Sequence, residues 1–207
     1  ASDVYKRQGG IGLINNVTVA FSVVVVTAIL GHFGAAALAG YGLGSRLELM
    51  LTPLVFGVGS ALTAGVGANV GAHNFQRARS IAWAGASIAF LVTGGIGIMV
   101  AVMPALWLDW FMADEAAYKV AVLYLAIAGP FYGFFGAGQA LYFASQGTGR
   151  LLLPICVGVV RFLTISLVGL VAVWMDWPIQ VVFAGVSAGL LVTGIGMALC
   201  LFSADWR

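Results

Sequence analysis

The stretch LAGYGLGSRLELMLTPLVFGVGSALTAGVGANVGAHNFQRARSIAW, residues 38–83, contains a long apolar run, a short polar turn and the start of a second apolar run. The first run exceeds the length needed to cross a bilayer, because a spanning helix takes about 20 mostly apolar residues. The turn, AHNFQRAR, carries Arg77 and Arg79 and no acid. This pattern predicts two membrane-spanning helices joined by a basic loop.

The composition of the whole chain is that of a membrane protein. Hydrophobic residues make up 62% of it and charged residues 8%, whereas about a quarter of the residues of a soluble domain are charged. The formal net charge of +2 is too small to indicate a nucleic-acid partner or a polybasic lipid-binding surface. Cys156 and Cys200 lie inside apolar runs, where cysteine acts as a small hydrophobe, so they predict neither a disulfide framework nor a metal site.

Six apolar runs are separated by clusters of polar, Gly and Pro residues. They are too long for barrel strands of about 10 residues and do not alternate, so we expect an all-α integral membrane protein, a six-transmembrane-helix bundle. Residues 1–8, ASDVYKRQ, fit poorly with the apolar run that begins at Gly9 and resemble translated adapter sequence, so we expect a non-native leader at 1–8 and the six spans within 9–207. The expected spans are 9–30, 35–72, 77–103, 116–145, 150–174 and 178–203.

The loops predict an orientation in the membrane. The turn after the second span carries Arg77 and Arg79, and the turn after the fourth carries Arg150, with no acid in either. The positive-inside rule makes these loops cytoplasmic, so both ends of this chain are expected inside a cell (inner or plasma) membrane. The remaining loops hold mostly acids and are expected outside, with Asp109, Asp114, Glu115 and Asp176 against one base, Lys119.

Pairs of glycines in GxxxG spacing lie inside the spans. Small residues at this spacing let helix backbones approach closely, which supplies packing between helices in a bilayer. We interpret them as packing positions in a tight bundle. The pairs are Gly67 and Gly71, Gly129 and Gly133, and Gly185 and Gly189.

Residues 38–83, together with ALYFASQGTGRLLLP and GVVRFLT within 140–164, resemble the C-terminal half of a MATE-family (multidrug and toxic compound extrusion) transporter. The resemblance implies twelve spans in two six-helix lobes related by a pseudo-two-fold axis, of which this chain is the second. It implies export of amphipathic, mostly cationic organic compounds in exchange for Na⁺ or H⁺. The implied partners are the bilayer, the N-terminal six-helix lobe of the same protein and a small organic substrate.

The resemblance also implies where the coupling ion is held. Some members carry coupling carboxylates on the first and fourth helices of the second lobe, and others use an aspartate of the first lobe. Here the first span offers Asn15 and Asn16, and the fourth has Glu115 at its external edge with no acid inside. An amide cannot take up a proton, so we expect H⁺ or Na⁺ to be bound in the N-terminal lobe, with no other cofactor and no metal.

The fourth span carries a stripe of rings and amides that repeats at intervals of 8, 3, 4, 3 and 4 residues, which places them on one helical face. Aromatic faces attract cations and amides orient a ligand, so the stripe suits a substrate cleft. The alternative is that these are amphipathic core residues. The stripe consists of Tyr124, Tyr132, Phe135, Gln139, Tyr142 and Gln146.

Asn15 and Asn16 are further cleft candidates, with packing between helices as the alternative, because buried amides are costly unless hydrogen-bonded. Pro53 and Pro130 lie inside spans, where proline removes a backbone hydrogen bond and favours a kink. We consider both as hinges for alternating access. Static membrane bundles also tolerate proline.

Arg46 and Glu48 are charged residues in an otherwise apolar span. If the helix begins near Ala35, Glu48 lies about 20 Å from its external end, and Arg161 lies about 15 Å from the start of the fifth span. These depths are comparable in a core about 30 Å thick. We therefore predict that Glu48 and Arg161 form a buried ion pair, while Arg46 bonds to carbonyl groups or to the outer rim.

Other functions are less favoured by the sequence. A lipid-linked precursor flippase of related helix arrangement would need several basic residues in its cavity, and only Arg161 lies near a span centre. A non-transporting scaffold or channel subunit is a further alternative. No zinc, hydrolase or Walker motif appears, so we expect that the chain is not an enzyme and has no catalytic residues.

Overall fold

The computed structural model describes residues 21–111, 114–149 and 152–203, and the regular structure in these ranges is helical. Five segments are long and apolar enough to cross a membrane, which confirms the all-α membrane fold. The helices are Phe21–Gly31, α2 (Ala35–Gly71), α3 (Phe75–Val102), α4 (Ala105–Leu108), α5 (Glu115–Ala128), the 3₁₀ turn η1 (Gly129–Phe131), α6 (Tyr132–Thr148), α7 (Leu152–Trp174) and α8 (Ile179–Ser203).

The helix boundaries follow from local chemistry. Gly34, before α2, and Gly149, after α6, have positive φ of 97° and 72°, a conformation that glycine adopts without steric cost. Asp114 precedes α5 and accepts a hydrogen bond from the Ala116 amide at 3.2 Å. This bond satisfies one of the free N–H groups at the start of the helix.

The fourth predicted span is not one continuous α-helix. Pro130 has no N–H group to donate to the carbonyl of the preceding turn, and the chain tightens into η1 between α5 and α6. Neighbouring helices bond to carbonyls beside the break: the Ser187 hydroxyl donates to Ile127 at 3.2 Å and the Thr93 hydroxyl to Tyr132 at 2.9 Å. The break is therefore held in place from both sides. By contrast, α2 continues through Pro53 as one helix.

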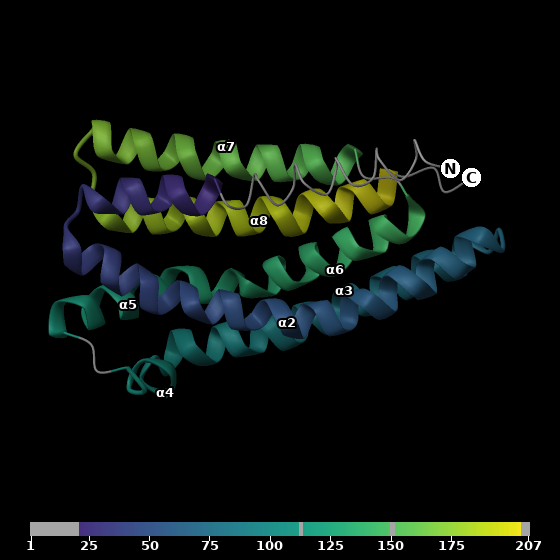
Figure 1. Ribbon diagram of the computed structural model, residues 1–207, viewed down its shortest axis with the longest axis horizontal. Helices are drawn as coiled ribbons and strands as arrows, with labels where there is room; N and C mark the ends of the chain where they lie inside the picture. The colour runs from purple at the N-terminus through teal and green to yellow at the C-terminus, as the bar shows by residue number, and fades with distance from the viewer. Residues whose placement is uncertain (1–20, 112–113, 150–151, 204–207) are drawn as a thin grey trace.

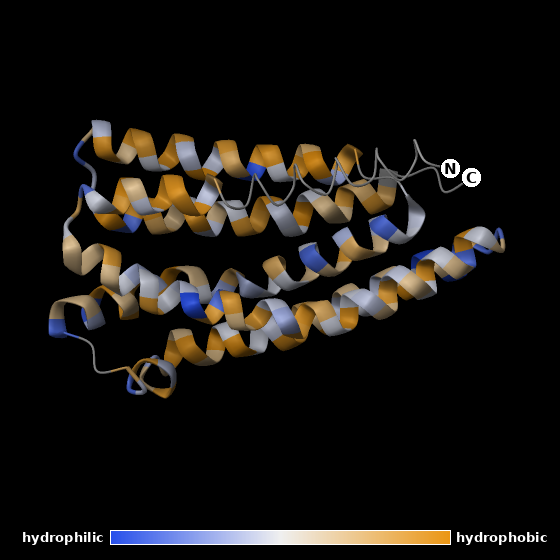
Figure 2. Cartoon of the chain, viewed as in Figure 1, coloured by the Kyte–Doolittle hydropathy of each residue, from blue (hydrophilic) through white to orange (hydrophobic). Residues whose placement is uncertain are grey.

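The helices form two groups, which Figure 1 shows lying side by side. One group contains α7, α8 and the helix Phe21–Gly31, and the other contains α2, α3, α5 and α6. Contacts of α8 with α6 and, less extensively, with α5 join the two groups. α7 packs mainly on α8 and has almost no direct contact with α2. The surfaces of the helices are largely apolar, and hydrophilic residues lie near the helix ends and at a few positions along the helices (Figure 2).

Backbone-to-backbone packing joins α3 to the break between α5 and α6. A Cβ atom on Gly97 would overlap the carbonyl oxygen of Gly129, and one on Gly94 would lie 3.3 Å from the Cα of Gly133. We call this contact the glycine seam, defined by Gly94, Gly97, Gly129, Gly133 and Gly136. Two of the predicted GxxxG pairs, Gly129 with Gly133 and Gly185 with Gly189, thus face a neighbouring helix.

In the third pair, Gly67 and Gly71, only one glycine contacts a neighbouring helix. Gly67 faces the backbone of Gly147, but nothing lies within 4 Å of a Cβ on Gly71. Spacing alone therefore did not identify the packing positions.

Candidate functional site

A tyrosine of α5 contacts a carboxylate of α2 in the interior of the bundle. Tyr124 is fully buried, and its ring lies against Gly44, where a Cβ atom would overlap the ring. Because Gly44 leaves this space, the Tyr124 hydroxyl reaches the next turn of α2 and donates a hydrogen bond to Oε1 of Glu48. Gly44 and Glu48 lie four residues apart on one face of α2, so the first leaves space for the Tyr124 ring and the second accepts from its hydroxyl.

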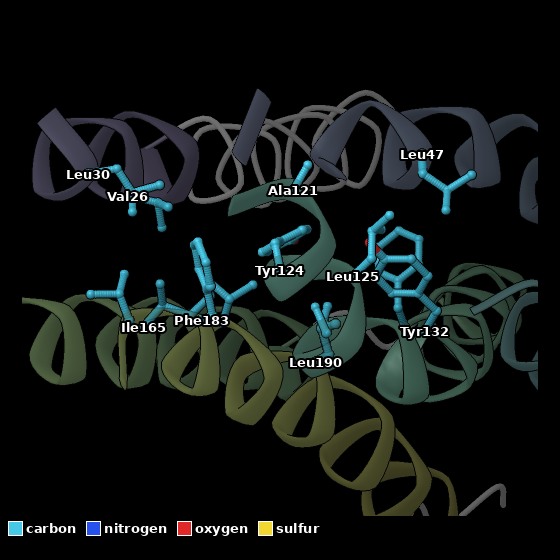
Figure 3. Close-up of a cluster of buried hydrophobic side chains, with 14 of the residues drawn as sticks. Val26, Leu30, Leu47, Ala121, Tyr124, Leu125, Tyr132, Ile165, Phe183 and Leu190 are labelled. Carbon is cyan, nitrogen blue, oxygen red and sulfur yellow. The ribbon is translucent and has the colours of Figure 1, made fainter. Parts of the chain in front are cut away.

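Two further rings surround Tyr124. Tyr41 of α2 meets it edge-on with ring centroids 5.2 Å apart, and Phe183 of α8 does so at 5.1 Å. Figure 3 shows Tyr124 between Phe183 and Leu125 in the buried core that α2, α5 and α8 share. The rings fix the position of the hydroxyl that bonds to Glu48, since edge-to-face aromatic contacts orient the side chains.

Arg161 of α7 interacts electrostatically with this site but forms no ion pair with the carboxylate. Its side-chain stem passes Gly189 of α8, and its Nε is buried without a hydrogen-bond partner. Arg161 interacts electrostatically with Glu48, but the two form no ion pair within 4.0 Å. The predicted direct bridge is therefore not formed in this structure, in which the carboxyl group accepts a hydrogen bond from Tyr124 of α5.

Tyr132, at the start of α6, completes the group. Its side chain is fully buried, its hydroxyl oxygen has no hydrogen-bond partner, and it interacts with Glu48. We call the set of Tyr41, Glu48, Tyr124, Tyr132 and Arg161 the glutamate cluster. Ionisable residues within membrane spans are rare and costly, and by default they mark functional sites.

The outer end of α2 is held by the segment around α4. Nε1 of Trp107 donates to the Leu43 carbonyl at 3.0 Å. The exposed guanidinium of Arg46 lies over the ring of Phe111, 5.5 Å from its centroid. Arg46 thus has a partner at the rim rather than in the interior.

The structure separates the members of the ring-and-amide stripe. Tyr132, Phe135 and Tyr142 are buried, with at most 7% of each side chain exposed, and they belong to the hydrophobic core. This burial favours the core interpretation for these three residues. Gln139 is half-buried and Gln146 is exposed, so the amides retain open surface.

The remaining candidate residues concern the first span, metal binding and the cysteines. Asn15 and Asn16 lie outside the described residues. Within the described ranges, no three His, Cys, Asp or Glu side chains are grouped closely enough to hold a metal ion. Cys156 and Cys200 form no disulfide bond.

Sequence reasoning identified Glu48 and Arg161 but not the tyrosines that organise them. Tyr41 and Gly44 precede Glu48 by seven and four residues and therefore lie on one face of α2, which is a signal that the sequence carries. The stripe of the fourth span included Tyr124 and Tyr132, but as part of a cleft lining. What the sequence did not show is that α5 adjoins this face of α2.

The chain has clear relatives. The MatE family model matches residues 13–171. The chain is 23% identical over 153 residues to the probable multidrug resistance protein YoeA of Bacillus subtilis (strain 168), covering 74% of this chain and 33% of YoeA. It is 24% identical over 188 residues to the probable multidrug resistance protein NorM of Thermotoga maritima, covering 86% of this chain and 40% of NorM.

A solved structure shows the same fold. The MATE transporter ClbM in complex with Rb⁺ superposes with a TM-score of 0.89 at 20% sequence identity, covering 99% of this chain and 48% of ClbM. The chain thus spans less than half the length of these relatives.

Proposed function

The chain belongs to the MatE family, and we propose that it forms one lobe of a cation-coupled antiporter that exports amphipathic, mostly cationic organic compounds. The names of its relatives YoeA and NorM describe multidrug resistance. Our proposal includes a second, N-terminal six-helix lobe in the active protein, with this chain as the C-terminal one, and the 48% coverage of ClbM supports it.

The observation that carries the proposal is the glutamate cluster. A static membrane bundle has no need of a half-buried carboxylate and guanidinium beside two fully buried phenols, because polar and charged groups are costly within a membrane. A protein that changes conformation while it moves a charged compound can use such groups. The transporter interpretation therefore accounts for these residues, and a scaffold function does not.

The coupling ion, H⁺ or Na⁺, is assigned to the N-terminal lobe. The first span of this chain carries the amides Asn15 and Asn16 and no acid, and Glu115 lies at the exposed start of α5. Neither position provides a carboxylate inside the first or fourth span.

The substrate cleft between the lobes is assigned to the amide side of α6. Gln139 and Gln146 retain open surface, and amides orient a ligand without fixing one geometry. The buried rings of Phe135 and Tyr142 lie behind them in the core. Asn15 and Asn16 are the corresponding candidates on the first span. Pro53 remains the candidate hinge, whereas the break at Pro130 is held by bonds from Ser187 and Thr93.

We assign the chain to the plasma (inner) membrane with both of its ends cytoplasmic. Arg77 and Arg79 begin α3 beside the turn that follows α2, and Figure 1 shows that turn at the end opposite α4. The acids at the α4 end, Asp109 and Asp114, fit an external loop under the positive-inside rule.

A lipid-linked precursor flippase is supported less well. Such a protein would gather several cations for a pyrophosphate group, whereas Arg161 faces an acid, Glu48. An enzymatic function has no support in the motifs of the chain.

Dye accumulation in an exporter-deficient strain tests the proposal. The full-length protein that contains this lobe should lower accumulation of a cationic dye, and collapse of the cation gradient should abolish the effect. The 207-residue chain expressed alone should leave accumulation unchanged. Gradient-dependent export by this chain alone, or no export by a full-length protein that reaches the membrane, would contradict the proposal.

Two substitutions in α6 distinguish the cleft from the core. Gln139→Ala should alter the range of exported dyes more than the abundance of the protein, because the amide is half-exposed. Tyr142→Ala should lower abundance, because it removes a ring that is 7% exposed. If Gln139→Ala lowers abundance and export of every dye equally, Gln139 belongs to the core instead.

A further inference from the structure

Two unsatisfied donors converge on one carboxyl group in the glutamate cluster. The Tyr132 hydroxyl and the Nε of Arg161 are both buried and lack hydrogen-bond partners, and both residues interact with Glu48. Buried polar groups without partners are uncommon in native structures and cost free energy. We therefore infer that the Tyr132 hydroxyl and the Arg161 guanidinium bond to Glu48 in another conformation of the lobe.

The protonation state of Glu48 decides which of these bonds can form. A neutral carboxyl group has one O–H donor, whereas an ionised one only accepts, at up to four lone-pair positions. A neutral Glu48 accepts from Tyr124, as it does here, and can donate its own proton to the free Tyr132 oxygen. An ionised Glu48 can accept from Tyr132 and take the Arg161 guanidinium as its counter-ion.

The packing allows the second arrangement. α7 is held by α8 and by the helix Phe21–Gly31, where Gly169 faces Ile29, but it has almost no direct contact with α2. The stem of Arg161 lies against Gly189 of α8, a position without a side chain to block it. Few direct contacts between α7 and α2 therefore oppose a movement of the Arg161 guanidinium toward Glu48.

We propose that Glu48 is a proton-binding group whose ionisation controls a contact between α2 and α7. We call this contact between Glu48 and Arg161 the latch. With its proton, Glu48 bonds to Tyr124 and Tyr132, and Arg161 is released. Ionisation breaks the carboxyl O–H bond, leaves the electron pair on the oxygen and passes the proton to water. The carboxylate then pairs with Arg161 and draws α7 toward α2.

The titratable groups around this carboxyl, among the described residues, are Tyr41 on α2, Tyr124 on α5, Tyr132 on α6 and Arg161 on α7. Of these, Arg161 is the charged one over the ordinary pH range, so it controls the ionised state of Glu48. The latch adds a proton-dependent contact to this lobe and leaves the coupling ion of the N-terminal lobe where we proposed it.

Infrared spectroscopy of the full-length protein in lipid nanodiscs tests the latch. The carbonyl stretch of a protonated carboxyl group is titrated from acid to alkaline pH, and the Glu48→Gln variant is subtracted to isolate the band of Glu48. The expected result is a Glu48 band that is present at acid pH and lost as pH rises. In Arg161→Gln the band should persist to higher pH by about one to three units, because the carboxylate has lost its counter-ion.

Matched variants separate the latch from a general effect of charge. Arg161→Lys should restore part of the wild-type behaviour because it keeps the positive charge. Arg46→Gln removes an exposed arginine of the same segment and should leave the titration unchanged. A wild-type band that is absent or constant at every pH overturns the proposal, and so does an Arg161→Gln titration identical to wild type.

If Arg161→Gln fails to fold, the wild-type titration, isolated by subtraction of Glu48→Gln, can still refute the latch. Loss of dye export with an intact, Arg161-dependent titration would count against the transport function and not against the latch.

Discussion

The glycine seam and the glutamate cluster join helices of the same lobe in opposite ways. At the seam, Gly97 and Gly129 bring two backbones into contact, and the Thr93 hydroxyl donates to the carbonyls of both Ala89 and Tyr132. In the cluster, side chains bridge the helices, and the Tyr132 hydroxyl and the Nε of Arg161 are buried without hydrogen-bond partners. The glycine seam is closely packed and the Thr93 hydroxyl is hydrogen-bonded, whereas the glutamate cluster contains donors that have no hydrogen-bond partners.

This difference indicates which parts of the lobe can move. Packed backbones resist sliding because any shift creates overlap, so α3, α5 and α6 should behave as one rigid unit. A contact made by long side chains with alternative partners can have two arrangements of similar free energy. We therefore expect the conformational changes of this lobe to occur between α2 and α7, and not between α3 and α6.

The largest expected effect is from a methyl group placed in the seam. Gly97→Ala would overlap the Gly129 carbonyl, so α3 must separate from α5, and we expect a loss of about 3 kcal/mol or more, at the upper end for overpacking. Gly95→Ala is the matched control, because nothing lies within 4 Å of its Cβ. Yield of monodisperse protein and thermal melting measure both. Equal behaviour of the two variants would show that the seam is not rigid.

A smaller effect is expected from removal of the carboxylate in the cluster. Glu48→Ala leaves the buried Tyr124 hydroxyl without its acceptor, which should cost about 1 to 3 kcal/mol of stability. Glu115→Ala is the control, since its ion pair with Lys119 is solvent-exposed and such pairs contribute about 0 to 1 kcal/mol. Chemical denaturation in detergent would compare them. A cluster variant more damaging than Gly97→Ala would reverse the comparison.

The smallest effect is expected at the hydroxyl that ties the seam to the break in the fourth span. Thr93→Val removes the bond to the Tyr132 carbonyl and should cost about 0.5 to 1.5 kcal/mol. Thr27→Val removes an exposed hydroxyl that bonds only within its own helix, to Val23 at 2.7 Å, and should have almost no effect. Melting temperatures of the pair provide the measurement, and a stable Thr93→Val variant would mean that glycine packing alone holds the seam.

The helices were predictable and the site only in part. The second span was expected at 35–72 and is found at Ala35–Gly71, because Gly34 and the polar turn after Gly71 mark its ends in the sequence. Pro130 indicated a kink in the fourth span, where η1 is found. Depth along the helices predicted an ion pair between Glu48 and Arg161, and the structure shows an electrostatic interaction without an ion pair within 4.0 Å. Depth does not specify which helix adjoins which face, however, so the bond from Tyr124 to Glu48 was not foreseen.

The most direct test of the rigid seam and the movable cluster compares two distances in one protein. In a full-length protein with Cys156 and Cys200 replaced by alanine, one spin-label pair replaces the exposed Leu49 of α2 and Leu167 of α7. A second pair replaces the exposed Ile98 of α3 and Ala126 of α5. Electron paramagnetic resonance then follows both distances as pH changes. We predict that the α2–α7 distance shortens as pH rises while the α3–α5 distance stays constant; a constant α2–α7 distance, or equal changes in both pairs, would contradict the account.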